Sequence, residues 1–351
     1  MHDGANCRQN IPLSSFPGTS TQSHLLRSIC LLSHRFHICC HHLPPPYHYQ
    51  SASGQPNVIV TSLDFSKAFD SVRHSTLLSK MIELDLPAYM YNWMVSFFSG
   101  HAHRTVYNGE VSSMTPTSAS IVQGSSIGPA SYAVTAADLR PVHADNSLVK
   151  FADDTYLVIP ATSADTRVAE LGRIAAWVAD TDNNLWLNMS KTREVMLYDY
   201  RRRHRIQPLP PLPDITRSTT LKVLGVTFTV TLSASDHVRR VISNSAQSLY
   251  ALRVLRHHGL GEAGLQTVFR AVVVSRLTYA TSAWIGFITG ADNQRIEAFL
   301  SYSKRCGYCS PDLPDFVQLV EEGDERLFTR INNNSSHVLR GLLPPPSMAT
   351  Q

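Results

Sequence analysis

The chain has 351 residues, a formal net charge of +4 and a hydrophobic fraction of 43%. That length allows a core of two or three subdomains, and so mild a basic excess does not by itself indicate nucleic acid. No apolar run reaches the about 18 residues of a membrane span, so we expect no membrane partner. Six cysteines in so long a chain predict reduced thiols and an intracellular location, nuclear or cytoplasmic.

Regular structure is predicted from Asn57 onward. Residues 1–56 are rich in Ser, His, Pro and Cys, and three consecutive prolines interrupt any regular element there. An apolar run then begins at Asn57 and leads into Asp64, as in a buried strand. The further predicted elements are helices over 66–84 and 87–98, a hairpin turn at Asn108-Gly109, a helix over 126–139, two strands over 147–159, a helix over 164–185, strands over 194–198 and 221–228, and helices over 236–299.

Asp64 is the first candidate for chemistry. It ends an apolar strand and precedes a helix. A carboxylate is costly to bury, so an aspartate there needs a partner or a metal ion. Taken alone, it is better explained as the N-cap of the following helix.

Asp153 and Asp154 make a metal-binding role for Asp64 more plausible than an N-cap alone. The two adjacent acids lie between apolar segments over 148–151 and 156–159, and so short a link predicts a tight hairpin with both acids at its tip. For this pair alone, a solvated turn is an equally good explanation. Together with Asp64, however, the pair supplies three carboxylates. Two divalent ions about 3.5–4 Å apart, which activate a hydroxyl and stabilise a leaving pyrophosphate, need such ligands.

Five short motifs occur in order along the chain. They read LDFSKAFD over 63–70, QGSSIGP over 123–129, FADD over 151–154, LNMSKT over 187–192 and LKVLGV over 221–226. In this order and spacing they resemble the motifs of non-long-terminal-repeat (LINE-like) retrotransposon reverse transcriptases. The resemblance covers roughly residues 57–300, and five ordered motifs are far more specific than any one of them.

The resemblance implies a role for each matching residue near the metal. Asp64 and Asp153 would be the main ligands of two Mg²⁺ ions, for which Mn²⁺ is an alternative. Asp154 would be a third carboxylate, and the Phe65 carbonyl would face the metal. Lys191 would protonate or neutralise the departing pyrophosphate. Without the resemblance, Lys191 is equally well explained as an ordinary exposed lysine.

The resemblance also implies where the substrates bind. Phe69 falls where the family has an aromatic ring beneath the sugar, and a ring there would exclude a 2′-hydroxyl. Taken alone, Phe69 is better explained as a core aromatic on a helix. Gln123 and Gly124 would shape the nucleotide pocket, since glycine lets the backbone approach a ligand closely. Leu224 and Gly225 would support the primer end.

Basic residues recur along the predicted helices after residue 236. Arg239, Arg240, Arg253 and Arg256 would form a stripe that follows a phosphate backbone. A solvated helix face explains them at least as well. The same two explanations apply to the cluster RRRHR over 201–205.

The implied fold is α+β. A palm, formed by an antiparallel sheet with helices on one face, is followed by a helical thumb. The chain is expected to be truncated at the fingers end, because only the stretch from Phe16 to Leu26 resembles a fingers segment. The expected division is a poorly ordered segment with a fingers remnant over 1–56, the palm with partial fingers over 57–230, a thumb-like region over 231–310 and a C-terminal tail over 311–351.

Three functions fit these observations. The first is an RNA-directed DNA polymerase whose partners are an RNA template, a DNA primer and a deoxynucleoside triphosphate, with no stable protein partner. The second is a catalytically inactive retroelement remnant that at most binds nucleic acid. The third, a two-metal nuclease, leaves Gln123, Gly124 and Lys191 without a role. RNA-templated primer extension separates the three.

Overall fold

The computed structural model describes residues 57–84, 86–122, 124–180, 183–198, 209–335, 337, 339–340 and 343. The predictions for residues 1–56, for Gln123 and for the basic cluster over 201–205 lie outside these residues.

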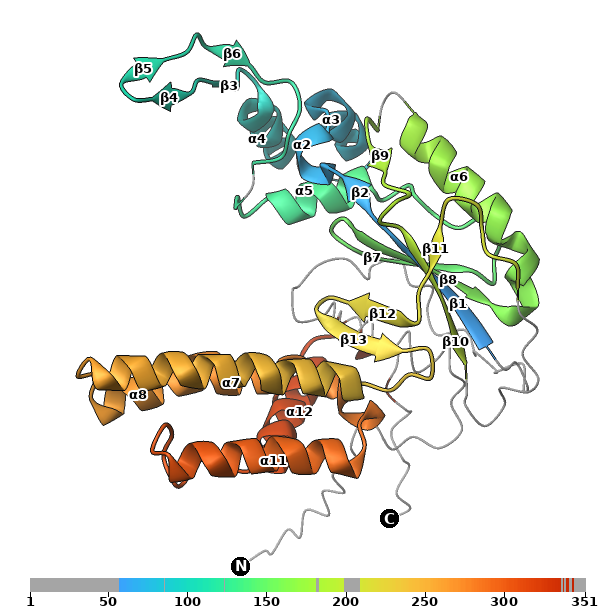
Figure 1. Cartoon of the computed structure of the whole chain (residues 1–351). Helices are drawn as coiled ribbons and strands as arrows, with labels where there is room; N and C mark the ends of the chain where they lie inside the picture. Colours follow the sequence, from blue (N-terminus) through green and yellow to red (C-terminus); the bar gives the residue numbers. More distant parts are fainter. Residues whose placement is uncertain are drawn as a thin grey trace, which may run out of the picture.

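A five-stranded sheet occupies the centre of the first half, in the order β11-β10-β1-β8-β7 (Figure 1). Its strands are β1 (Asn57–Leu63), β7 (Ser147–Phe151), β8 (Asp154–Pro160), β10 (Arg193–Tyr198) and β11 (Thr216–Arg217). β1 is antiparallel to both of its neighbours, whereas the edge strand β11 is parallel to β10. The predicted antiparallel sheet is thus present in β7, β8, β1 and β10, and the parallel edge strand β11 is an addition to it, because a two-residue strand has no periodicity from which its direction can be predicted.

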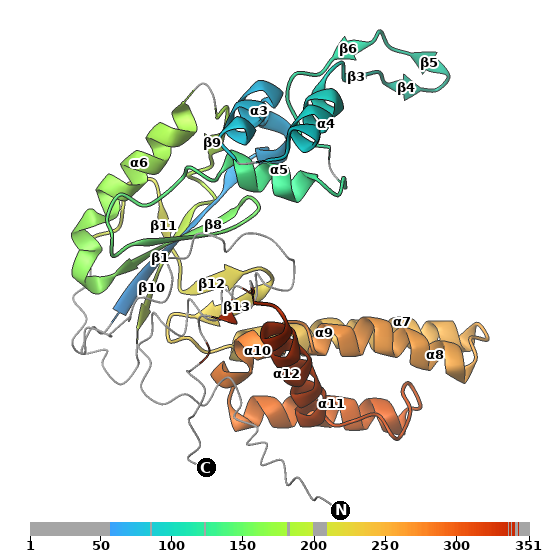
Figure 2. The same cartoon turned by 180° about the vertical axis from the view of Figure 1, so that it is seen from behind.

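The sheet separates two apolar cores. Alternate residues of a strand face opposite sides, so Val58 and Val60 of β1 join one core and Ile59 joins the other. The core around Ile59 is closed by helices, and the core around Val60 continues into the C-terminal half (Figure 2). The helices of the first half are α2 (Ala68–Ser71), α3 (His74–Ile82), α4 (Ala88–Phe98), α5 (Gly128–Thr135), η1 (Ala161–Thr166) and α6 (Arg167–Ala179). This arrangement confirms the predicted α+β class.

The helix predicted over 66–84 is two short helices. Lys67, which precedes α2, has a left-handed backbone with φ of 51°, and Val72 between the helices is extended. A continuous helix cannot pass through either conformation. Hydrophobic periodicity does not reveal such breaks, because α3 still buries Leu77 and Met81 in the core that contains Ile59.

A narrow two-stranded arm extends from the helical side (Figure 1). At its end Asn108 and Gly109 both have positive φ, 49° and 85°. These angles are typical of the type I′ turn that joins two strands, so the predicted hairpin turn is confirmed. The short strands here are β3 (Ala102–His103), β4 (Val106–Tyr107), β5 (Glu110–Val111) and β6 (Thr115–Pro116).

The segment predicted as a single strand over 221–228 is a hairpin. β12 (Thr220–Val223) and β13 (Val226–Thr229) are joined by Leu224 and Gly225, whose φ angles are 44° and 90°. Glycine adopts this conformation readily, but a leucine rarely does. The hairpin covers the core around Val60, beside the C-terminal helices.

Helices make up the C-terminal half. They are α7 (Ser235–His257), α8 (Glu262–Val268), the π-helix η3 (Phe269–Val274), α9 (Ser275–Leu277), α10 (Thr281–Trp284), η4 (Ile285–Phe287), α11 (Gly290–Arg305) and α12 (Phe316–Asn333). Within the described part of the chain, none of the helices has the length and apolar character needed to cross a membrane.

The division that assigned residues 311–351 to a tail is wrong for α12. This helix begins with a capping box in which Asp315 accepts from the Gln318 backbone at 2.8 Å. Phe316, Leu319 and Val320 are buried in the same core as α7 and α11. Ile331, near the end of the helix, is buried as well, and α12 packs against α10 and α11, so this stretch is an integral part of the helical half.

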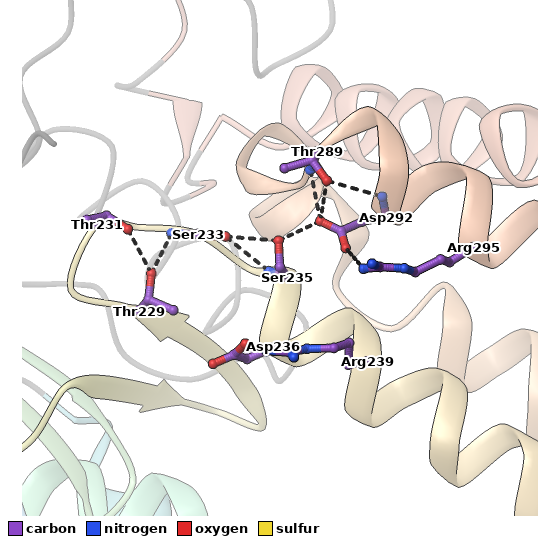
Figure 3. Close-up of polar contacts among 9 residues, drawn as sticks. All are labelled: Thr229, Thr231, Ser233, Ser235, Asp236, Arg239, Thr289, Asp292 and Arg295. Atoms are coloured by element: carbon purple, nitrogen blue, oxygen red, sulfur yellow. Dashed lines mark hydrogen bonds and ion pairs between the residues drawn. The ribbon is translucent and has the colours of Figure 1, made fainter. Parts of the chain in front are cut away.

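A polar network joins the hairpin to the start of the helical half (Figure 3). Asp292, which is 1% exposed, accepts from the Ser235 hydroxyl at 2.5 Å and from the Thr289 hydroxyl at 2.7 Å. Ser233 and Ser235 are hydrogen-bonded at 3.1 Å, and the Ser233 amide donates to Thr229 at the end of β13. The end of β13 and the starts of α7 and α11 are therefore fastened together.

A buried ion-pair cluster joins strands β10 and β11 to helix α6. The Glu194 carboxylate on β10 is 1% exposed and accepts from Arg167 on α6 at 2.8 Å. Its other oxygen is paired with Arg217 on the edge strand β11. One glutamate thus connects a helix and the edge strand to the strand beside β1.

Candidate catalytic site

Strand register brings Asp64 and Asp154 together. Asp64 directly follows β1, and Asp154 is the first residue of β8. Leu63 pairs with Thr155 in the antiparallel ladder, so the next step of the same register places Asp64 opposite Asp154. Side chains opposite each other in an antiparallel pair lie on the same face of the sheet, with Cβ atoms about 4.5–5.5 Å apart. The two residues, 90 positions apart in the sequence, therefore stand at the same end of the sheet, and the charge of Asp64 acts on Asp154.

Asp153 stands in the turn between β7 and β8. Phe151 pairs with Asp154, so the link is the two residues Ala152 and Asp153, and Ala152 has a positive φ of 49°. The predicted tight hairpin with its acids at the tip is confirmed. Asp153 is half-buried, whereas Asp154 is exposed.

The charges of the three acids act on one another. Although the residue as a whole is exposed, partial removal of water from the Asp154 carboxylate, and then the negative charges of Asp153 and Asp64, raise its pKa, while Lys222 opposes the rise. Burial likewise raises the pKa of Asp153, and the charge of Asp64 adds to it. The carboxylates therefore repel one another at the end of the sheet, and Lys222 on β12 faces the same point.

The donor chemistry of these acids fits a divalent cation. Carboxylate oxygens are the ligands that Mg²⁺ prefers, and a bound cation would offset the burial and the mutual repulsion that together raise the pKa of Asp153 and Asp154. In the portion of the chain that the structure describes, no three His, Cys, Asp or Glu side chains already converge as a preformed metal site. Asp64, Asp153 and Asp154 are thus the residues that would have to close around an ion.

We expect Asp153→Asn to unfold at a higher temperature than the wild type when no metal is present at pH 7. A raised pKa means that the folded state binds the proton more tightly than the unfolded chain, whose pKa is about 3.9. The ionised carboxylate then destabilises the fold at neutral pH, and this cost fades as the pH falls toward 4. Thermal melts between pH 4 and 8 check the trend.

The exposed Asp165 on η1, at the opposite end of β8, provides the matched control as Asp165→Asn. Added Mg²⁺ or Mn²⁺ should raise the midpoint of the wild type and of this control more than that of Asp153→Asn. A variant less stable than the wild type at pH 7 would contradict the prediction.

Lys191 lies on a turn that is fastened to the backbone of Asp64. The Asn188 amide donates to the Asp64 carbonyl at 2.7 Å, and the Asp64 amide donates to the Thr192 hydroxyl at 3.4 Å. The preceding strand β9 (Trp186–Leu187) pairs with β2 (Phe65–Ser66), directly after Asp64. The exposed Lys191 side chain is thereby attached close to the acids, and its chemical role stays a prediction.

An aromatic pair lies near Asp153. The rings of Phe69 and Tyr132, the latter on α5, are stacked with centroids 5.0 Å apart and planes at 26°. Burial and then the charge of Asp153 raise the pKa of Tyr132, so this phenol lies within electrostatic reach of the acid. Gly124 precedes α5 with a φ of +83° and open space where a side chain would be. The Phe65 ring is buried in the core, and the metal contact expected of its carbonyl remains a prediction.

A cavity of about 400 Å³ opens beside Asp154. Its lining comprises Phe151, Asp154, Tyr156, Lys222, Leu224, Gly225 and Tyr279. The two residues expected to support a primer end therefore share a cavity with one of the acids. Four residues near the acids were not among the site residues predicted from the sequence. They are Lys222, Tyr132, Tyr156 and Tyr279. Lys222 lies within a recognised motif, which was a usable signal, whereas Tyr279 lies outside all five motifs.

The four arginines predicted to contact nucleic acid differ in their surroundings. Arg239 is exposed and pairs with an aspartate one turn earlier on α7. Arg240 donates to the tip of the β12-β13 hairpin, and Arg256 donates to a carbonyl on α11's C-terminal side and lies 4.6 Å from the Tyr308 ring centroid. Arg253 is exposed. Contact with nucleic acid stays a prediction for all four.

Comparison with known protein families identifies the family of this chain. The family described as "Reverse transcriptase (RNA-dependent DNA polymerase)" matches residues 13–228, which is more than half of the chain. This chain belongs to that family, and the resemblance that its five motifs indicated is confirmed.

Two relatives come from Drosophila melanogaster. The "RNA-directed DNA polymerase from mobile element jockey" is 34% identical over 109 residues, which are 29% of this chain and 12% of that protein. The "Probable RNA-directed DNA polymerase from transposon X-element" is 24% identical over 251 residues, 67% of this chain and 26% of that protein. The chain thus spans well under two thirds of the length of the curated relatives it matches.

Among solved structures, telomerase from Candida tropicalis in complex with a telomeric RNA fragment aligns with a TM-score of 0.42 and 13% identity, over 86% of this chain and 49% of that one. Telomerase from Candida albicans aligns with a TM-score of 0.40 and 11% identity, over 95% of this chain and 57% of that one.

Proposed function

We propose that this chain is the polymerase core of a retrotransposon reverse transcriptase. It extends the 3′-hydroxyl of a DNA primer with deoxynucleoside triphosphates on an RNA template. The observation that carries the proposal is the juxtaposition of Asp64, Asp153 and Asp154 at one end of the sheet. Family membership supports the reaction class, and relatives named for mobile elements support the origin.

The reaction is an in-line attack of the primer hydroxyl on the α-phosphate of the incoming nucleotide. Asp64 and Asp153 would hold two divalent ions, Mg²⁺ or Mn²⁺, with Asp154 as a third carboxylate. When bound, such ions would supply activation of the hydroxyl and stabilisation of the pyrophosphate. Lys191, on the turn attached to Asp64, neutralises or protonates the departing pyrophosphate. Leu224 and Gly225 support the primer end from across the cavity beside Asp154.

In this proposal the sheet and its helices over 57–230 are the palm, and the helices that follow are the thumb. The exposed Arg239 and Arg253 on α7 contact the phosphates of the template–primer duplex. Primer extension with the purified chain, an RNA template and Mg²⁺ tests the function. No incorporation by the folded wild type would favour an inactive remnant, and cleavage of nucleic acid without added nucleotides would favour a nuclease.

We expect Phe69→Ala to raise ribonucleotide incorporation relative to deoxynucleotide incorporation by about 10–200-fold, the range for one steric contact in a pocket. The Phe69 ring, stacked on Tyr132, would occupy the space of a 2′-hydroxyl, and alanine would leave that space open. The measurement is kcat/KM for a matched pair of ribo- and deoxynucleoside triphosphates. Phe328→Ala, at a half-exposed phenylalanine on α12, is the control. An unchanged ratio in Phe69→Ala would remove Phe69 from the nucleotide pocket.

A further inference from the structure

Tyr279, which follows α9 in the helical half, contacts the tip of the β12-β13 hairpin. Its hydroxyl donates to the Leu224 carbonyl at 2.9 Å, across 55 positions of sequence. Its ring lies 3.7 Å from where a Cβ on Gly225 would stand. The same tyrosine lines the cavity beside Asp154. A residue outside every recognised motif therefore touches both the hairpin tip and the space next to the acids.

Arg240 on α7 holds the same tip from a second helix. Its guanidinium donates to the Gly225 carbonyl at 2.9 Å and to the Thr227 hydroxyl at 2.8 Å. The carbonyls of Leu224 and Gly225, the two residues of the turn, thus both accept hydrogen bonds from the helical half. This contact gives Arg240 a structural role beside the phosphate contact that the sequence predicts for it.

The tip needs such support because its backbone is strained. Leu224 has a φ of 44°, a left-handed conformation that disfavours leucine and persists only where the surroundings enforce it. Its side chain packs against the core around Val60, so the leucine is held there by contacts that a glycine would lack. Tyr279 and Arg240 supply the hydrogen bonds on the other side of the turn.

The base of the hairpin is tied to the same helices. Ser233, just after β13, is hydrogen-bonded to Ser235 at the start of α7, and Ser235 donates to Asp292 at the start of α11 (Figure 3). Both ends of the hairpin are therefore attached to the helical half. The hairpin is therefore connected to these helices by hydrogen bonds at the edge of the cavity.

We propose that Tyr279 and Arg240 are positioning residues that set the hairpin tip against Asp154, so that the placement of the thumb helices is transmitted to the primer end. This inference rests on the proposed function. A misplacement of about 1 Å at a reacting centre costs on the order of 10²-fold in rate, so two hydrogen bonds that place the tip matter for catalysis.

Hydrogen–deuterium exchange on the full chain tests the positioning without any need for activity. Tyr279→Phe keeps the ring and removes only the hydroxyl, and Arg240→Lys removes the guanidinium. Amides of the hairpin over 220–229 should exchange about 2–10-fold faster in each variant, the effect of one lost hydrogen bond, while β1 and β8 exchange as in the wild type. Tyr250→Phe, at an exposed tyrosine on α7, should change nothing. Unchanged exchange at the hairpin in both variants overturns the inference.

Primer extension tests whether Tyr279 affects catalysis at the primer end. Tyr279→Phe should lower kcat about tenfold with KM for the nucleotide unchanged, and it should lower extension from a mismatched 3′ end more than from a matched one. A general loss of folding would not produce this pattern. Wild-type rates on both primers would refute the role at the primer end while leaving the proposed function in place. No extension by the wild type would refute the proposed function, and the exchange experiment, which needs no activity, would still decide whether Tyr279 and Arg240 hold the hairpin tip.

Discussion

Asp153→Asn is expected to reduce RNA-templated primer extension by more than about 10³-fold. Asparagine has nearly the same shape and tolerates a tight turn, so the β7-β8 hairpin keeps its geometry. The substitution removes one of three negative charges that act on one another at the end of the sheet. Metal ions supply several kcal/mol of charge stabilisation in such reactions, and each 1.36 kcal/mol is about tenfold in rate.

Two further variants define the experiment. Asp64→Asn should lose activity to a similar degree, because Asp64 lies opposite Asp154 in the strand register. Asp165→Asn makes the same chemical change at an exposed aspartate on η1, at the other end of β8, and should extend primers at the wild-type rate. Extension by Asp153→Asn within tenfold of the wild type would end the two-metal proposal for these acids.

Glu194→Ala is expected to cost about 3–5 kcal/mol of unfolding free energy, the range for breaking a buried ion pair. The Glu194 carboxylate is 1% exposed, and the side chain of its partner Arg167 is 7% exposed. Alanine would leave that guanidinium buried without its counter-charge and would also release Arg217 on the edge strand. Urea denaturation followed by circular dichroism measures the difference, which is expected as a lower midpoint at an unchanged slope.

Glu322→Ala is the matched control. Glu322 and Arg326 form an exposed pair on α12 at 3.9 Å. Exposed pairs contribute about 0–1 kcal/mol, so this variant should stay within about 0.5 kcal/mol of the wild type. If both glutamate variants were equally stable, the buried cluster would not be holding the sheet edge to α6.

The sequence was most informative where a local pattern determines the structure. The apolar run before Asp64 and the short link around Asp153 predicted a strand and a tight hairpin, and both are present. An apolar run of this length predicts a buried strand, and two apolar segments separated by only a few residues predict a tight turn. The turn at Asn108-Gly109 was predictable for the same reason, since both residues accept positive φ.

The sequence-based predictions were wrong where a segment's structure depends on contacts with other elements. The strand over 221–228 is a hairpin because Leu224 tolerates a positive φ only with the support of Tyr279, the core and Arg240. The expected tail contains α12, whose Phe316 becomes buried only when other helices of the C-terminal half cover it. The residues around Phe316 do not by themselves show that it will be buried, and those around Leu224 do not show that other helices will support its turn.

The sequence by itself determined the order of the motifs, the α+β class and the family, because those depend on residue types and spacing along one chain. Only the tertiary structure decided that β1 lies between β8 and β10, which sets Asp64 opposite Asp154. It alone also brought Tyr132 to Asp153 and Tyr279 to Leu224. The physical reason is that strand register and helix packing are settled by the burial of whole faces, a free energy shared among residues that no local pattern connects.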